Sequence, residues 1–283
     1  PKQTERGRRN IFTIEVRKTK RNIKRKYGRK RAAIGPLWAK DPSLSANLLE
    51  DLDRQKDEEY FQFEHKENSR GKIQYQQDLK VPTLNMHSLR DSGKREELGI
   101  WAEQNDIDIL LIQETWTNQC TVERRTKYTI FFSSNDENTT NRTEAGVAIM
   151  IKNKHLNKII DVEPIDDRIM AISIRGTVTY TFINTYLYTS THPEKNPEIY
   201  KKLKDTVNRY KRGGPVFIGG DFNADIQSKD ATDNEIIGAH TFDKKHENAL
   251  PDDGMISNRD ELIDFCTERS YAIMNTWFQK SEE

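Results

Sequence analysis

The 283-residue sequence has only two cysteines, Cys120 and Cys266, which lie far apart and lack the close spacing of a zinc site. We therefore expect two free thiols in a reducing compartment and no disulfide framework. No apolar run approaches the roughly 18 residues needed to cross a bilayer, and no hydrophobic N-terminal segment marks the chain for export. These absences predict a nuclear or cytoplasmic (intracellular) protein without a membrane partner.

The sequence is also poor in hydrophobic residues, at 34%, and rich in charged ones, at 32%, with a mean hydropathy of -0.90. Its net charge of +1 conceals an asymmetry, because residues 1–35 hold 14 Lys or Arg against two Glu. That stretch therefore carries +12, and the remainder of the chain carries −11. A basic arm before an acidic body is typical of a segment that meets polyanions.

The first 73 residues show little apolar periodicity, so we expect a largely disordered extension, basic and then acidic, followed by one domain at 74–283. The basic stretch Lys18 to Arg31 is a solvated linker, a nuclear import signal or a contact to nucleic acid. An acidic helix is expected within 45–67. These alternatives stay open at the level of the sequence.

From Gln74 onward, candidate strands alternate with candidate helices, which indicates a layered α/β (α+β) domain. We expect strands at 78–86, 107–114, 128–133, 145–152, 168–175, 178–187, 215–221 and 271–275, and helices at about 94–104, 197–211 and 259–269. Asn196 and Asn258 are the expected residues at the starts of the last two helices. Cys266 falls on the apolar side of the third helix, so we expect a core residue there.

Two segments place a carboxylate at the end of an apolar strand. Glu114 follows Leu110-Leu111-Ile112-Gln113, where it has either reached solvent or compensates a hard cation such as Mg²⁺. Asp221 lies in Gly219-Gly220-Asp221-Phe222-Asn223, which is either an ordinary turn or a place where a carboxylate accepts a proton while Asn223 donates to phosphate. The ends of strands are where ligands bind in layered α/β folds.

Two further strand ends carry polar residues whose meaning is weak in isolation. Asn85 ends the first candidate strand of the domain, and turns favour asparagine anyway. Tyr186 lies in Asn184-Thr185-Tyr186-Leu187-Tyr188, where a tyrosine usually packs.

Taken together and in this order, the four segments resemble the endonuclease/exonuclease/phosphatase superfamily. Within it, the sequence is similar to the endonuclease domains of non-LTR retrotransposon endonuclease–reverse transcriptases and to craniofacial development protein 2-like sequences. Supporting phrases are Ala145-Gly146-Val147-Ala148, Asp167-Arg168-Ile169-Met170 and Asn275-Thr276-Trp277-Phe278. The resemblance covers about residues 78–280. It implies an exonuclease III/DNase I-like fold, a two-sheet β-sandwich flanked by helices.

The resemblance also implies roles for particular residues. Asn85 and Glu114 would hold a divalent ion, Mg²⁺ or Mn²⁺, and Tyr186 would contact the scissile phosphate or assist the nucleophile. Asp221 would activate the attacking water, and Asn223 would orient it. The implied reaction is metal-dependent hydrolysis of a DNA phosphodiester, without a small-molecule cofactor.

Two residues near these segments have a less definite part in substrate binding. Trp116, just past Glu114, would stack on a base or sugar of DNA, with core packing as the alternative. His87 occupies a position that is often Arg or Asp in relatives, near the expected DNA. The position of Tyr188 is usually proline in relatives.

Relatives continue with an Ile-Asp-Tyr-like strand and a Ser-Asp-His motif, and none of the six histidines of this sequence follows a Ser-Asp pair. We therefore expect a fold without its last strands and weak or no nuclease activity. Three functions stay open: a DNA-nicking retroelement endonuclease, another superfamily branch (an abasic-site repair nuclease, a phosphatase or a deadenylase), and a non-catalytic protein that binds nucleic acid or a partner. The oligomeric state cannot be predicted.

Overall fold

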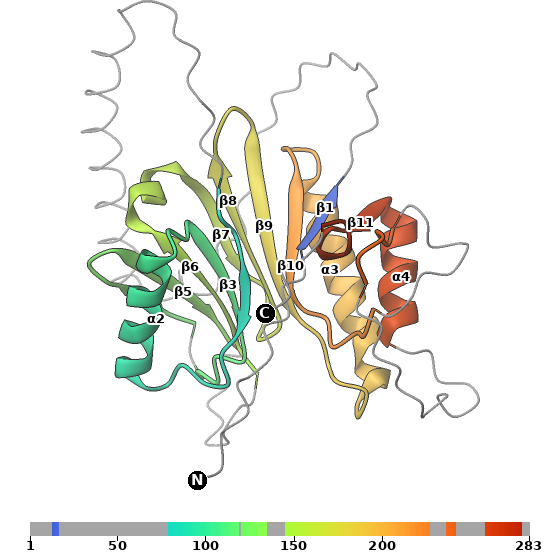
Figure 1. Cartoon of the computed structure of the whole chain (residues 1–283), viewed down its shortest axis with the longest axis horizontal. Coiled ribbons are helices and arrows are strands. Elements are labelled where there is room, and N and C mark those ends of the chain that lie inside the picture. The colour runs from blue at the N-terminus through green and yellow to red at the C-terminus, as the bar shows by residue number, and fades with distance from the viewer. Residues whose placement is uncertain are drawn as a thin grey trace, which may run out of the picture.

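The structure, a computed structural model, describes residues 13–16, 79–118, 120–134, 145–226, 236–241 and 258–278. Two β-sheets pack face to face, and helices cover their outer faces (Figure 1). The predicted fold, a two-sheet sandwich flanked by helices, is therefore confirmed. Among the described helices, none is long and apolar enough to span a membrane.

One sheet has five strands in the order β2-β3-β6-β5-β4. Its strands β2 and β3 are parallel, and the other neighbours are antiparallel. The strands are β2 (Thr83–Asn85), β3 (Ile109–Gln113), β4 (Val122–Arg124), β5 (Tyr128–Ser133) and β6 (Val147–Lys152).

The other sheet has six strands in the order β11-β1-β10-β9-β8-β7. Here β9 and β10 form the parallel pair, and the remaining neighbours are antiparallel. The strands are β1 (Thr13–Val16), β7 (Ile159–Pro164), β8 (Ile169–Arg175), β9 (Thr179–Tyr186), β10 (Val216–Asp221) and β11 (Tyr271–Ile273).

The helix α2 covers the five-stranded sheet, and α3 and α4 lie on the opposite side of the molecule, against the six-stranded sheet (Figure 1). Their bounds are α2 (Ser92–Gln104), α3 (Asn196–Tyr210) and α4 (Asn258–Arg269), with short 3₁₀ helices η2 (Asn153–Lys158), η3 (Pro193–Lys195) and η4 (Met274–Thr276). Asp91 caps α2, accepting a hydrogen bond from the backbone N–H of Lys94 (2.9 Å).

The buried strand β3 shows how the layers are built. Ile109 and Leu111 face the second sheet, whereas Leu110 and Ile112 face α2, so both sides of the strand are covered. This explains its continuous apolar sequence, because a strand buried on both faces has no solvent side to keep polar. Cys266 is buried among the residues under α4, as predicted, and burial raises the pKa of its thiol to about 12.

All eight predicted strands and all three predicted helices are present, within a few residues of the expected bounds for most of them. Three strands were missed. Both β4 and β7 are sheet edges rich in charged residues, and β7 ends in Pro164, so neither has the apolar pattern of a strand. The third, β1, lies inside the basic N-terminal stretch.

The strand β1 qualifies the predicted domain boundary at residue 74. It pairs antiparallel with both β10 and β11, so that residues 13–16 form part of the six-stranded sheet. The prediction of disorder for 1–73 did not foresee this strand. The remaining residues of that extension lie outside the described residues, and their predicted disorder stays a prediction.

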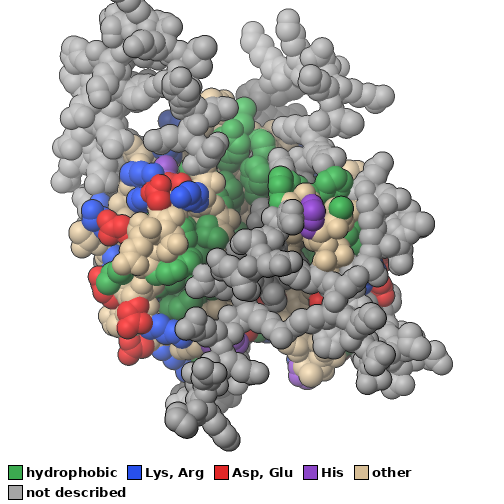
Figure 2. Space-filling model, in the orientation of Figure 1, with side chains coloured by type: hydrophobic (Ala, Val, Ile, Leu, Met, Phe, Trp, Pro, Cys, Tyr) green, Lys and Arg blue, Asp and Glu red, His purple; other side chains and the backbone are tan. Residues whose placement is uncertain are grey.

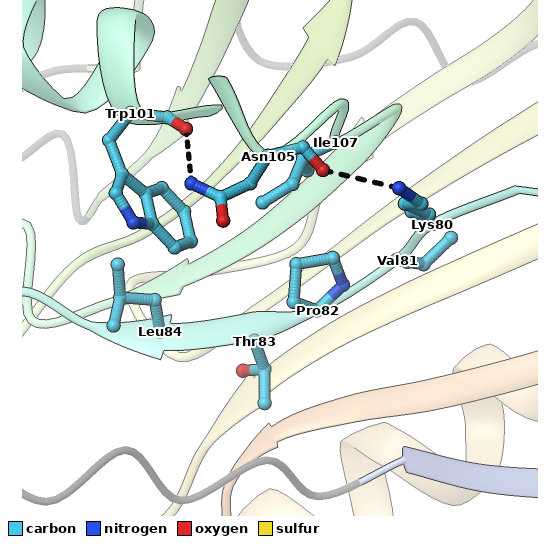
Figure 3. A pocket seen from close by; sticks show the side chains of 8 residues that line it. All are labelled: Lys80, Val81, Pro82, Thr83, Leu84, Trp101, Asn105 and Ile107. Carbon is cyan, nitrogen blue, oxygen red and sulfur yellow. Dashed lines mark hydrogen bonds between the residues drawn. The ribbon is translucent and has the colours of Figure 1, made fainter. Parts of the chain in front are cut away.

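The surface of the described residues has two further features. Lys, Arg, Asp and Glu side chains are intermixed over the α2 side of the molecule (Figure 2). A hollow of about 380 Å³ lies beside the edge strand β2 (Figure 3), lined by Lys80, Val81, Pro82, Thr83, Leu84, Trp101, Asn105 and Ile107.

A buried hydrogen-bonded pair, Asp108 and His155, lies near the beginning of β3. Oδ1 of Asp108 is 2.7 Å from Nε2 of His155, and Oδ2 accepts a hydrogen bond from the backbone N–H of Lys80 (3.1 Å). Burial opposes ionisation of Asp108, but hydrogen bonds from Lys154, His155 and Lys80 outweigh it and hold the pKa of Asp108 at about 2. Burial lowers the pKa of His155, and Asp108 only partly offsets this.

This pair predicts acid-sensitive stability. A histidine with a lowered pKa binds fewer protons when folded than when unfolded, so stability falls as the pH drops below about 6.5. The depressed pKa of Asp108 adds a further loss between about pH 4 and 2. Between pH 7 and 5 the histidine lowers the unfolding free energy of the wild-type protein by at most about 2 kcal/mol. We expect His155→Gln to remove this part of the pH dependence. Urea denaturation at both pH values measures this, with the exposed His192→Gln as control; an unaltered pH dependence in His155→Gln contradicts it.

Candidate active site

Four strands bring polar residues to one place between the two sheets. Asn85, Tyr186 and Asp221 are the last residues of β2, β9 and β10, and Glu114 directly follows β3. The parallel pairing of β9 with β10 sets Asp221 opposite Tyr186, and that of β2 with β3 sets Asn85 opposite Gln113. The carboxyl ends of both parallel pairs therefore meet across the sandwich.

The side chain of Asn85 joins the two carboxylates. Its Nδ2 donates to Oε1 of Glu114 (2.6 Å) and to Oδ2 of Asp221 (3.1 Å). Its Oδ1 accepts from the backbone N–H of His87 (3.3 Å). One amide thus holds two negative groups together although they are 107 positions apart in the sequence.

Glu114 has two further partners. The hydroxyl of Tyr186 donates to its Oε1 (3.1 Å), and Nδ1 of His87 lies 2.7 Å from its Oε2. Burial and the neighbouring carboxylate of Glu114 raise the pKa of Tyr186 above its usual range, so the hydroxyl stays protonated and acts as a donor. The side chain of Glu114 is 13% exposed and that of His87 68% exposed, so the site opens to solvent on the side of His87.

Asn223 orients Asp221 through its backbone. Its N–H donates to Oδ1 of Asp221 (2.9 Å), and its Nδ2 donates to the carbonyl of Leu187 (2.7 Å). An amide nitrogen carries two hydrogens, and this bond uses one of them. Phe222 is fully buried between them, which fixes the turn to the core.

The backbone is strained around the site. Non-glycine residues with left-handed φ values include His87 (45°), Glu114 (54°), Trp116 (55°) and Asn223 (46°). Such conformations cost free energy, and they persist only where the surrounding structure fixes them. Four of them at the ends of β2, β3 and β10 indicate that the side-chain positions here are imposed by the fold.

Trp116 and His87 lie together at the edge of the site. Their rings meet edge to face, with centroids 6.5 Å apart, and the carbonyl of Trp116 accepts a hydrogen bond from Nε of Arg90. Trp116 is partly exposed, while its Nε1 is buried without a hydrogen-bond partner among the described atoms. An aromatic face, an imidazole and a guanidinium therefore gather beside the carboxylates.

Arg168 and Tyr188 flank the site on the other sheet. The guanidinium of Arg168 lies over the ring of Tyr188, 3.5 Å from its centroid, and donates to the carbonyl of Tyr186 (3.3 Å). The backbone N–H of Tyr188 donates to Oδ1 of Asn196 (2.8 Å). A proline at this position has no such donor, so Tyr188 is tied to α3 in a way that proline does not allow.

The predicted start of α3 was wrong in its chemistry, because Asn196 lies inside the helix and no side chain caps it. Nδ2 of Asn196 donates to Oδ1 of Asn258 (2.9 Å), and Nδ2 of Asn258 donates to the carbonyls of Tyr188 and Asn223 (2.9 Å each). Both residues are buried. They secure the two loops that bear Tyr188 and Asn223, because buried carbonyl groups need partners.

The donor atoms suit a hard divalent cation. The carboxylate of Glu114 is an oxygen ligand, and Mg²⁺ is usually held by one or two carboxylates together with water and substrate phosphate. Asn85 presents Nδ2 to Glu114 and Oδ1 to the N–H of His87, so its amide would have to turn over to offer an oxygen beside the carboxylate. The described residues include no cluster of three His, Cys, Asp or Glu that would form a protein-only cage. The residues present therefore fit Mg²⁺ or Mn²⁺ bound partly by the substrate.

Comparison with protein families adds one decisive observation. Residues 83–279, more than half of the chain, match the endonuclease/exonuclease/phosphatase family. The chain belongs to this family. Its members are nucleases and phosphatases that hydrolyse phosphate esters, and the matched range contains all the strand ends described above.

Solved structures of this family resemble the chain at low identity. The endonuclease domain of TRAS1, a telomere-specific non-LTR retrotransposon, is 22% identical over 68% of this chain and 71% of that one (TM-score 0.41). An AP endonuclease from Archaeoglobus fulgidus is 24% identical over 56% and 64% (TM-score 0.39), and AP endonuclease LMAP from Leishmania major is 15% identical over 55% and 60% (TM-score 0.43). The chain thus spans under two thirds of the length of these two AP endonucleases. No curated protein matches.

The structure brings all seven candidate residues of the sequence to this site or its edge, but it also adds residues that were not singled out. Gln113, Asn184 and Arg168 were present in the quoted segments without a role. The available signal for the first two was a polar side chain inside an otherwise apolar strand, which is costly unless it has a partner.

Proposed function

We propose that this member of the endonuclease/exonuclease/phosphatase family is a DNA-nicking endonuclease domain of a retroelement, and that it hydrolyses phosphodiester bonds with Mg²⁺ or Mn²⁺. The observation that carries the proposal is the amide of Asn85, which holds the carboxylates of Glu114 and Asp221 side by side at 2.6 and 3.1 Å. The assignment to a retroelement is supported by the sequence phrases around Ala145, Asp167 and Asn275.

In this proposal each residue has a defined task. Glu114 would hold the cation, together with Asn85 once its amide has turned to present Oδ1, and the bound cation would supply Lewis-acid stabilisation of charge on the phosphate oxygens. Asp221 accepts the proton of the attacking water, and the backbone N–H of Asn223 keeps Asp221 in place for this. The protonated hydroxyl of Tyr186 has a single hydrogen, which it donates to Glu114 in this structure and would donate to phosphate instead when substrate is bound.

The DNA would approach across His87 and Trp116. Trp116 offers a face on which a base or sugar stacks, and Arg90 and Arg168 place positive charge on either side of the carboxylates. The basic residues 1–35 would add contacts to phosphate, and Lys18 to Arg31 would direct the protein to the nucleus. Those residues, except 13–16, lie outside the described ones.

The 283 residues contain no Ser-Asp-His sequence, and the one described histidine in contact with Glu114 is the exposed His87. A missing general acid or base lowers a rate by about 10²- to 10⁴-fold. For a protein made of these residues alone we therefore expect slow nicking, measurable with enzyme in excess over DNA.

Conversion of supercoiled plasmid to nicked circles tests the proposal. We expect nicking with Mg²⁺ or Mn²⁺ and none with EDTA, and no preference for a duplex that carries one abasic site. Faster cleavage at the abasic site, or release of phosphate from a monoester without nicking, would assign the chain to another branch of the family. DNA binding that weakens steeply with salt, without any nicking, would favour a non-catalytic binding protein.

A further inference from the structure

Behind the candidate active site, three buried polar residues connect the two sheets. Nε2 of Gln113 donates to Oδ1 of Asn184 (2.5 Å), and Oγ1 of Thr83 donates to Oε1 of Gln113 (3.0 Å). Gln113 and Thr83 belong to the five-stranded sheet and Asn184 to the six-stranded sheet. We call these three residues the inter-sheet amide cluster; all are at most 3% exposed.

Asn184 reaches furthest across the sandwich. Its Nδ2 donates to the carbonyls of Ile112 (2.8 Å) and Ala148 (2.9 Å), which lie on two strands of the opposite sheet. Both of its hydrogens and its oxygen are thus engaged, and the two carbonyl partners determine which end of the amide is the nitrogen. The side chain joins β9 to β3 and β6 directly.

The cluster is in register with the site. Thr83 precedes Asn85 by two residues, Gln113 directly precedes Glu114, and Asn184 precedes Tyr186 by two residues. Gly219, two residues before Asp221, pairs with Asn184 in the sheet. Every strand that carries a residue of the site is therefore bonded to the cluster or paired with it one or two residues earlier.

We propose that the inter-sheet amide cluster consists of positioning residues for phosphodiester hydrolysis: it fixes the distance between the sheets so that Glu114 and Tyr186 meet. The inference rests on the proposed function. Hydrophobic burial is non-directional, whereas a bonded buried amide network adds directional bonds that fix one arrangement. Glu114 needs such support, because its φ of 54° is unfavourable for a residue with a side chain.

Two of the cluster's side chains allow a graded test. Gln113→Met keeps the side-chain volume but leaves Oδ1 of Asn184 and the hydroxyl of Thr83 without their partner. Thr83→Val removes only the hydrogen bond from the Thr83 hydroxyl to Gln113. A matched control is Val207→Ala in α3, a core residue of another layer whose truncation also destabilises the fold. The denaturant midpoint of each variant is measured, so that the activities of Gln113→Met and Val207→Ala can be compared under conditions in which both are equally stable.

Plasmid nicking well below the unfolding temperature gives the first readout. We expect kcat to fall by about 10- to 100-fold in Gln113→Met and less in Thr83→Val, with KM for DNA little changed, since displacement of about 1 Å costs up to about 100-fold. Val207→Ala should keep the wild-type kcat. Equal kcat values in Gln113→Met and Val207→Ala at equal stability would overturn the proposal.

Amide hydrogen exchange gives a second readout that needs no activity. The backbone N–H groups of Thr115 and Trp116 bond to Gly146 and Ala145, and that of Ser88 bonds to Glu114. We expect these three amides to exchange faster in Gln113→Met than in Val207→Ala. If the wild-type chain does not nick DNA, the proposed function fails, but amide exchange still tests whether the inter-sheet amide cluster positions the site. Exchange at these amides that is the same in Gln113→Met and Val207→Ala would refute the positioning role.

Discussion

Asp221→Asn should lower the rate of plasmid nicking by about 10²- to 10⁴-fold. The substitution keeps the size of the side chain and an oxygen that accepts from the N–H of Asn223, but it removes the group that takes the proton from water. It also replaces the oxygen that accepts from Nδ2 of Asn85, so we expect the free energy of unfolding to fall by about 1 kcal/mol, the contribution of one hydrogen bond. Single-turnover nicking with enzyme in excess measures the rate.

The control for this variant is Asp264→Asn. It makes the same charge change at an exposed position of α4, outside the site. We expect wild-type nicking from it. If Asp221→Asn nicks as fast as Asp264→Asn, the nicking does not arise at this site, and the roles given to Asn85 and Glu114 fall with it.

Gly220→Ala should destabilise the fold by about 3 kcal/mol, the second large effect that we expect. Gly220 has a φ of 148°, which residues with a side chain rarely adopt, and a Cβ there would overlap the backbone carbonyl of its parallel neighbour Thr185. The neighbouring atoms belong to the middle of a sheet and cannot move aside without breaking the pairing of β9 with β10. Chemical denaturation measures the loss.

Gly99→Ala is the matched control for this substitution. Gly99 lies inside α2, and a Cβ there meets no atom within 4 Å. Alanine should therefore stabilise the protein by about 0.5–1 kcal/mol through helix propensity. A Gly220→Ala protein as stable as wild type would show that β10 does not approach β9 as closely as described.

The sequence predicted the central strands well because their side chains are buried on one or both faces and so are continuously or alternately apolar. It failed at β1, a four-residue strand within a basic segment, and at β4 and β7, which are sheet edges interrupted by charged residues. In those strands the backbone bonds to a neighbour decide the conformation, and a single sequence carries no record of that neighbour.

The asparagines illustrate the same difference on the scale of side chains. Asn196 and Asn258 each precede a helical pattern, and local rules favour a cap. In the structure they bond to one another, 62 positions apart, and to the loops of Tyr188 and Asn223. The local prediction was wrong for Asn196, because distant partners bind the amide group that a cap would use.

The sequence alone determined that Glu114 and Asp221 stand at the ends of apolar strands, since the apolar runs and the polar residues that end them are contiguous in the chain. Tertiary structure decided that these ends meet. Parallel pairing of β2 with β3 and of β9 with β10, and the packing of the two sheets, bring Asn85 within hydrogen-bonding distance of both carboxylates. The physical reason is that side-chain hydrogen bonds across a sandwich depend on register and sheet separation, which long-range packing sets and local sequence does not.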